Sequence, residues 1–93
     1  MQTKLIKTDD GIPNDSAGPS WDVYYGDRLI GEITADRVYA NGESAAFMGD
    51  RRMVVGSYYA ATDDCNIWQT FYVKEHGSAA AAKRAAREWL TTL

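Results

Sequence analysis

The side chains able to do acid–base or nucleophilic chemistry are few in this chain. His76 is the single histidine and Cys65 the single cysteine. A general base must lie within hydrogen-bond reach of the group that it deprotonates, and no spacing here indicates a triad built on His76. Asp63 and Asp64 precede Cys65, and neighbouring carboxylates oppose formation of the thiolate. The sequence therefore predicts no catalytic residue, and we do not expect an enzyme.

The paired acids are the remaining candidates for a metal site. Asp9-Asp10 and Asp63-Asp64 each offer two carboxylates, but neither fits the D-x-[DN]-x-[DN]-G pattern of a calcium loop. A single cysteine argues against a thiolate zinc site within one chain. The glycine-rich motifs that cradle phosphates are also missing from the sequence. We therefore expect neither a metal nor a cofactor.

Length and composition predict one globular domain over residues 1–93. Hydrophobic residues make up 45% of the chain and aromatic residues 12%, which is typical of a chain that folds around a core. The sequence contains no apolar stretch of the length that a signal peptide or a transmembrane helix requires. We therefore expect a cytoplasmic protein that makes no membrane contact.

Charge is distributed unevenly along the chain, whose net charge is −3. Residues 1–50 carry nine acids against four bases, whereas residues 51–93 carry four acids against six bases. Phosphates repel an acidic chain, so the overall balance favours a protein partner over direct binding to nucleic acid. The basic second half keeps nucleic acid as the alternative.

Turn-forming residues divide the first half of the chain. Thr3–Lys7 predicts a short strand, and residues 9–20 (DDGIPNDSAGPS) are dense in Gly, Pro, Asp and Ser, which predicts an irregular loop. Trp21–Tyr25 and Leu29–Thr34 then flank Gly26-Asp27, a pattern typical of a β-hairpin.

Two registers of this hairpin place different side chains on each face. A two-residue loop pairs Val23 with Ile30. A three-residue loop pairs Val23 with Gly31 and separates apolar from polar residues better, so we favour it. In that register one face carries Trp21, Val23, Tyr25, Leu29 and Ile33, and the other carries Asp22, Tyr24, Ile30, Glu32 and Thr34.

Further strands and one helix are predicted in the second half. Gly49-Asp50 indicates a second hairpin, with arms at 44–48 and 51–60, and residues 67–74 (IWQTFYVK) are typical of a strand. Ser78 is a favourable N-cap for an alanine-rich helix over residues 78–92. Five residues on one side of this helix are expected to face the sheet: Ala82, Ala85, Ala86, Trp89 and Leu93. The predicted fold class is α+β, with one antiparallel sheet of four or five strands packed on a C-terminal helix.

Alternation along residues 67–74 predicts a contact surface. If Ile67, Phe71 and Val73 point inward, Trp68 and Tyr72 point outward. The preferred hairpin register places Asp22, Tyr24, Ile30, Glu32 and Thr34 on that outward side. Exposed aromatic surface usually marks an interaction site. Carboxylates beside aromatic rings suit a protein partner with a basic surface, such as a nucleic-acid-binding complex. The predicted partner-binding residues are Asp22, Tyr24, Glu32, Trp68 and Tyr72. Cover by another segment of the chain or burial in a homodimer remains open.

The alternative site is basic. Arg51 and Arg52 open a strand after a tight turn, and the C-terminal helix presents further cations on its wet side. A nucleic-acid-binding module would use these residues: Arg51, Arg52, Lys74, Lys83 and Arg87.

Two likenesses accompany these patterns. WDV at 21–23, LIGEI at 29–33 and AAKRAAREWL at 81–90 loosely resemble the arm-binding domains of phage integrases and the related AP2-like fold, which implies a three-stranded sheet that enters a DNA groove. The profile of one small acidic domain without catalytic residues is similar in type to phage or mobile-element anti-defence proteins, including anti-CRISPR proteins. That likeness implies a stoichiometric inhibitor that occupies a basic surface of a host complex.

Overall fold

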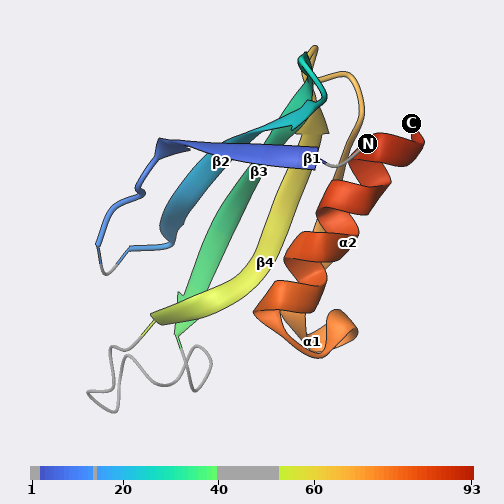
Figure 1. Cartoon of the computed structure of the whole chain (residues 1–93). Coiled ribbons are helices and arrows are strands. Elements are labelled where there is room, and N and C mark those ends of the chain that lie inside the picture. The colour runs from blue at the N-terminus through green and yellow to red at the C-terminus, as the bar shows by residue number, and fades with distance from the viewer. Residues whose placement is uncertain (1–2, 14, 40–52) are drawn as a thin grey trace.

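A computed structural model describes residues 3–13, 15–39 and 53–93 (Figure 1). These residues form a five-stranded antiparallel sheet in the order β1-β2-β3-β4-β5, with each strand beside its neighbour in sequence. Two helices follow the last strand, and the longer one packs against the sheet. The α+β class and the antiparallel sheet with a C-terminal helix are confirmed. The elements are β1 Thr3–Asp9, β2 Ala17–Tyr25, β3 Arg28–Tyr39, β4 Met53–Thr62, β5 Trp68–Tyr72, α1 Val73–His76 and α2 Ala79–Thr92.

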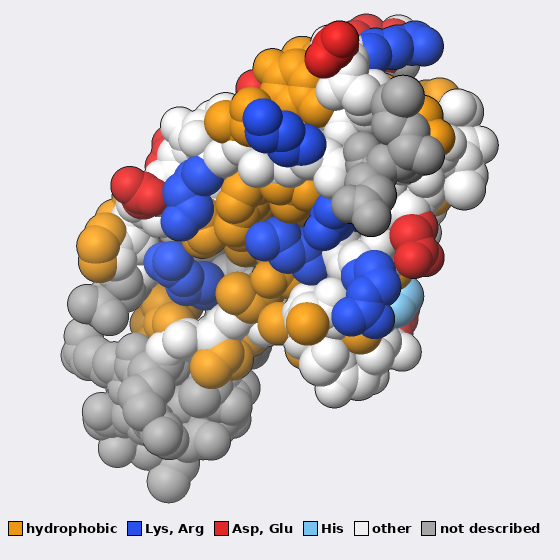
Figure 2. Space-filling model, viewed as in Figure 1, with side chains coloured by type: hydrophobic (Ala, Val, Ile, Leu, Met, Phe, Trp, Pro, Cys, Tyr) orange, Lys and Arg blue, Asp and Glu red, His pale blue; other side chains and the backbone are white. Residues whose placement is uncertain are grey.

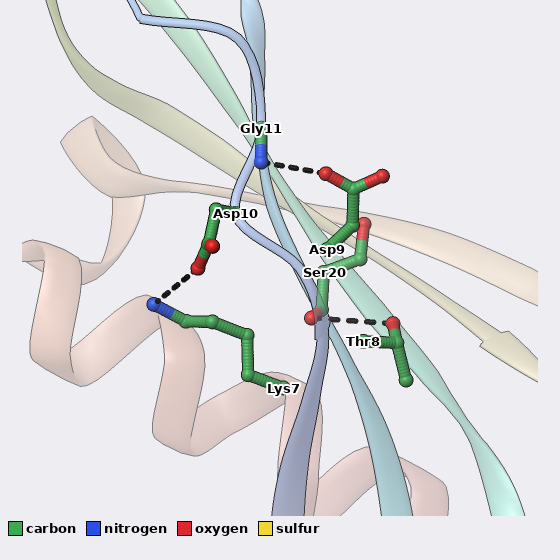
Figure 3. A network of polar contacts seen from close by, with 6 residues as sticks. All are labelled: Lys7, Thr8, Asp9, Asp10, Gly11 and Ser20. Carbon is green, nitrogen blue, oxygen red and sulfur yellow. Dashed lines mark hydrogen bonds and ion pairs between the residues drawn. The ribbon is translucent and has the colours of Figure 1, made fainter.

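The predicted loop over residues 9–20 is too long, because β2 already begins at Ala17. Asp9 Oδ1 accepts a hydrogen bond from the Gly11 amide at 2.7 Å (Figure 3). Asp15 Oδ1 accepts one from the Ala17 amide at 3.1 Å. These acids therefore close the turn locally. The register shifts between Ala17 and Ser20, which accommodates Pro19 within a strand. Residues 17–20 have the composition of a loop, so composition alone did not predict that they form the first part of β2.

The β2–β3 hairpin combines both predicted registers. Val23 pairs with Gly31, as the three-residue loop required, but Tyr25 pairs with Arg28, so the loop itself has the two residues Gly26-Asp27. A β-bulge between Val23 and Tyr24 absorbs the difference. The bulge reverses the expected places of two side chains, since Ile30 packs against the core and Leu29 is exposed.

The helix covers one part of one face of the sheet. Ser78 caps α2 by accepting a hydrogen bond from the Ala81 amide at 3.1 Å. Ala82, Ala86 and Leu90 are buried against β3, β4 and β5, and the small alanines allow a close approach. The expectation for Leu93 was wrong: it ends the helix and is exposed, and Leu90 takes the inward place.

Other details of the second half differ from expectation or lie outside the described residues. Ile67 was expected to point into the core, but β5 begins one residue later and Ile67 is half exposed. Val73 begins α1 and packs against the core, as does Phe71. The predicted hairpin at Gly49-Asp50, with its arm at 44–48, lies outside the described residues, whereas most of its second arm is β4.

Candidate functional site

Side chains of alternate residues point away from α2 and form a surface that we call the open face. Strand pairing sets Asp22 of β2 beside Glu32 of β3, then Ala61 of β4, then Trp68 of β5. Their neighbours along each strand, including Ile33 and Ala60, belong to the core on the helix side. Tyr24 and Tyr72 fall on the open face by the same alternation. All five predicted partner-binding residues, Asp22, Tyr24, Glu32, Trp68 and Tyr72, thus lie on one face, but the structure brings only three of them into one row across the strands: Asp22, Glu32 and Trp68. Tyr24 lies two residues from this row toward the β2–β3 turn, and Tyr72, which pairs with Ser57, lies four residues from it in the opposite direction.

Aromatic rings dominate the β5 edge of this face. Trp68 is 61% exposed and Tyr72 is 46% exposed, so both rings are accessible in the part of the chain that the structure describes. Tyr59 of β4 stacks on Trp68 with ring centroids 5.9 Å apart and an interplanar angle of 29°. Sequence reasoning missed Tyr59, because in the pair Tyr58-Tyr59 only the observed register shows that Tyr58 is buried and Tyr59 is outward. The stack of Tyr59 and Trp68 provides a wide, rigid apolar platform.

Two acidic residues are cross-strand neighbours at the centre of the open face. Asp22 and Glu32 are direct partners across β2 and β3, an arrangement in which like charges destabilise a sheet. Among residues 3–13, 15–39 and 53–93 there is one ion pair, between Lys7 Nζ and Asp10 Oδ1 at 3.5 Å. Neither Asp22 nor Glu32 takes part in it. Lys4 of β1 pairs with Tyr24 and so lies on the same face, but it forms no ion pair with either acid in the described residues. The two acids and this one base leave the open face with more negative than positive charge.

A second cluster of charge lies on the helix side of the sheet. Lys83 of α2 places Nζ 3.7 Å from the ring centroid of Trp21 on β2. Arg87 lies one turn further along α2 and donates three hydrogen bonds to Thr3. Its Nε and Nη2 donate to Thr3 Oγ1 at 3.0 Å and 2.8 Å, and Nη2 also donates to the carbonyl oxygen of Thr3 at 3.0 Å. Lys7 pairs with Trp21 across the strands and so shares this side. We call Lys7, Lys83 and Arg87 the basic cluster.

The neighbouring cations affect the pKa of Lys83. Burial lowers the pKa of the Lys83 ammonium below its ordinary value, and the nearby positive charges of Arg87 and Lys7 lower it further. Acidic side chains are not among the groups that shift it. The cluster is thus a local concentration of positive charge in an acidic chain.

The basic residues predicted from sequence separate into three groups. Lys83 and Arg87 are together in the basic cluster, and Lys7 joins them although sequence reasoning missed it. No pattern could have found Lys7, because its place depends on how β1 pairs with β2. Lys74 lies on α1, which packs on β4, β5 and α2 instead. Arg51 and Arg52 lie outside the described residues.

The residues first considered for chemistry lie apart from both surfaces. His76 ends α1, with its ring 6.0 Å from that of Phe71. Cys65 is exposed in the turn between β4 and β5 and has a left-handed backbone with φ of 61°. Within the described ranges, three or more His, Cys, Asp or Glu side chains do not gather anywhere in a way that could hold a metal ion.

The turn at Cys65 yields a prediction about pH. Asp64 accepts hydrogen bonds from Thr62 Oγ1 at 2.6 Å and from the Asn66 amide at 3.1 Å, and these bonds hold its pKa below the ordinary value. A depressed carboxyl pKa contributes stability above the unfolded-state pKa, and that stability is lost as pH falls through the folded-state pKa. Asp64→Asn is therefore expected to lower the Tm by a few degrees at neutral pH and to have little effect near pH 2, measured by thermal melts across pH. An equal loss at both pH values would contradict this origin.

No protein-family model, curated protein or solved structure shows a significant match to the chain. Among the helices that the structure describes, none has the length and apolar character needed to cross a membrane.

Proposed function

We propose that this protein is a non-enzymatic binding module that engages a basic surface of a partner protein through its open face. The observation that carries the proposal is the direct pairing of Asp22 with Glu32 across two strands. A like-charge pair in this position costs the free protein stability. A cationic side chain of a partner placed between the two carboxylates removes that repulsion. The free energy by which the repulsion destabilises the free protein then contributes to the affinity of the complex.

The aromatic platform supplies the other half of the contact. Trp68 and Tyr59 stack beside the acidic pair, and Tyr72 lies further along β5. A guanidinium group stacks well on such rings and also pairs with carboxylates, so arginine side chains match this surface best. Tryptophan and tyrosine are also the residues that most often carry binding energy in protein interfaces.

The consequence proposed for the partner is inhibition. Proteins that hold nucleic acid present arginine-rich and lysine-rich surfaces. A module that covers such a surface with carboxylates and aromatic rings competes with the nucleic acid for it. The small size of the chain and its acidic balance fit a stoichiometric inhibitor of the phage or mobile-element type.

Partner capture tests the function, and Glu32→Lys tests the site. A tagged protein is expected to retain a stoichiometric protein partner from host lysate whether or not nuclease is added, identified by mass spectrometry. Glu32→Lys is expected to weaken that complex at least about tenfold, which corresponds to about 1.4 kcal/mol. The same change is expected to leave the Tm unchanged or to raise it, because it turns a like-charge cross-strand pair into an opposite-charge pair.

Glu88→Lys is the matched control. Glu88 is exposed on α2, away from the open face, and its replacement alters the net charge by the same amount. Affinity measured by calorimetry should be almost unchanged in this variant. Equal losses for Glu32→Lys and Glu88→Lys would show a nonspecific charge effect and reject the open face as the site. A partner that disappears on nuclease treatment would reject protein binding itself.

A further inference from the structure

The basic cluster lies on the side of the sheet opposite to the open face, and the proposed function does not use it. Figure 2 shows Lys and Arg side chains gathered beside apolar ones on the face that contains β1 and α2. Strand β1 contributes Lys7, and one flank of α2 contributes Lys83 and Arg87. Trp21 and Leu5 lie among them, each only partly buried. The cluster therefore combines positive charge with accessible apolar surface.

Specific contacts hold two side chains of the basic cluster in place. Lys83 is held against Trp21 by a cation–π contact at 3.7 Å, and Arg87 is fixed to Thr3 by three hydrogen bonds. These contacts leave the Lys83 ammonium and Nη1 of Arg87 with donors that make no hydrogen bond to the described residues. Asp10 pairs with Lys7 at 3.5 Å, whereas Lys83 and Arg87 form no ion pair within the described residues. An anionic ligand would therefore relieve the repulsion between Lys83 and Arg87.

We propose that the basic cluster binds the phosphate backbone of a single-stranded nucleic acid. Lys83 and Arg87 are four residues apart on α2, about 6 Å along the helix axis, which is similar to the distance between successive phosphates of an extended strand. Sugar contacts fit the exposed apolar surface of Leu5 and the part of Trp21 that Lys83 does not cover. A duplex fits less well, because α2 is packed against the sheet and cannot enter a groove. The proposed nucleic-acid site and the proposed protein site are on opposite faces and are tested separately.

The test is fluorescence anisotropy with labelled oligo-dT and oligo-U of about 12 nucleotides, within the length that small single-strand-binding domains cover. Binding is expected at low salt and is expected to weaken with a log–log slope of about −2, since three phosphates each contribute about −0.7 on a single strand. Lys83→Gln and Lys7→Gln should each make the slope less steep by about 0.7. Arg87 is left unchanged in this test, because it also fixes β1 to α2.

Lys74→Gln is the matched control, since it removes the same charge from α1, outside the cluster. It should leave the slope unchanged, and thermal melts should show that all three variants are folded. Absence of binding at low salt, or the same slope in the Lys83 and Lys74 variants, would overturn the proposal. Displacement of the oligonucleotide by polyglutamate at equal charge concentration would instead indicate an acidic protein ligand. Glu32→Lys should not weaken oligonucleotide binding, so this test and that of the open face fail independently.

Discussion

Phe71→Ala is expected to lower the free energy of unfolding by about 3–5 kcal/mol. Phe71 is 4% exposed and meets the edge of the Trp89 ring, with centroids 5.8 Å apart and an interplanar angle of 84°. Removing the ring therefore leaves a cavity where β5 meets α2, in addition to the loss of apolar burial. A domain of 93 residues has a total stability of about 5–14 kcal/mol, so the loss is a large part of it.

Urea unfolding followed by far-ultraviolet circular dichroism measures this effect. Phe71→Leu is the comparison, because leucine refills most of the volume and is expected to cost much less than alanine. If Phe71→Ala unfolds the chain completely, Phe71→Leu still gives a measurable midpoint. A loss below about 1 kcal/mol for alanine would contradict the packing of α2 on β5, since buried Phe→Ala changes cost more than that.

Trp68→Ala is expected to reduce affinity for the protein partner by about 30-fold or more, the effect of losing an interface side chain worth about 2 kcal/mol. Trp68 is 61% exposed, so its removal costs the fold little beyond the stack with Tyr59. Trp68 and Phe71 lie on the same strand but on opposite faces. Their replacements are thus expected to have opposite signatures, loss of binding in one and loss of stability in the other.

Gln69→Ala provides the control for Trp68. Gln69 is exposed and is the next residue along β5, but it lies on the other face of the sheet. Titration calorimetry with the captured partner should give nearly the same affinity for Gln69→Ala as for the unmodified protein. Full affinity of Trp68→Ala would remove the aromatic platform from the proposed interface.

Local patterns in the sequence were sufficient to predict the fold class. The apolar alternation of β2 and β5, the turn at Gly26-Asp27 and the Ser78 cap each act over a few residues, and all of them appear in the structure. The same alternation was sufficient to place Trp68 and Tyr72 on a common outward side. The face that a strand residue occupies is therefore predictable as soon as one inward residue of that strand is known.

Features that depend on pairing between distant segments were not predictable in the same way. The bulge at Ile30 arises because β3 must satisfy a two-residue turn and the Val23–Gly31 pair together. The place of Lys7 beside Lys83 requires β1 to pair with β2 and α2 to lie across the sheet. Neither condition produces a recognisable pattern among neighbouring residues, so the bulge and the position of Lys7 could not be predicted from one sequence.

The opposite signs on the two sides of the sheet make the molecule an electric dipole directed through the sheet. Asp22 and Glu32 form its negative side, and Lys83 and Arg87 belong to its positive side. In the field of a charged surface such a molecule experiences a torque before any atoms touch. Within about 10 Å of a basic surface, the screening length at 0.1 M salt, it turns the open face forward. If the open face binds a basic partner as proposed, docking is expected to begin from an aligned encounter, and a higher salt concentration is expected to slow association more than it speeds dissociation.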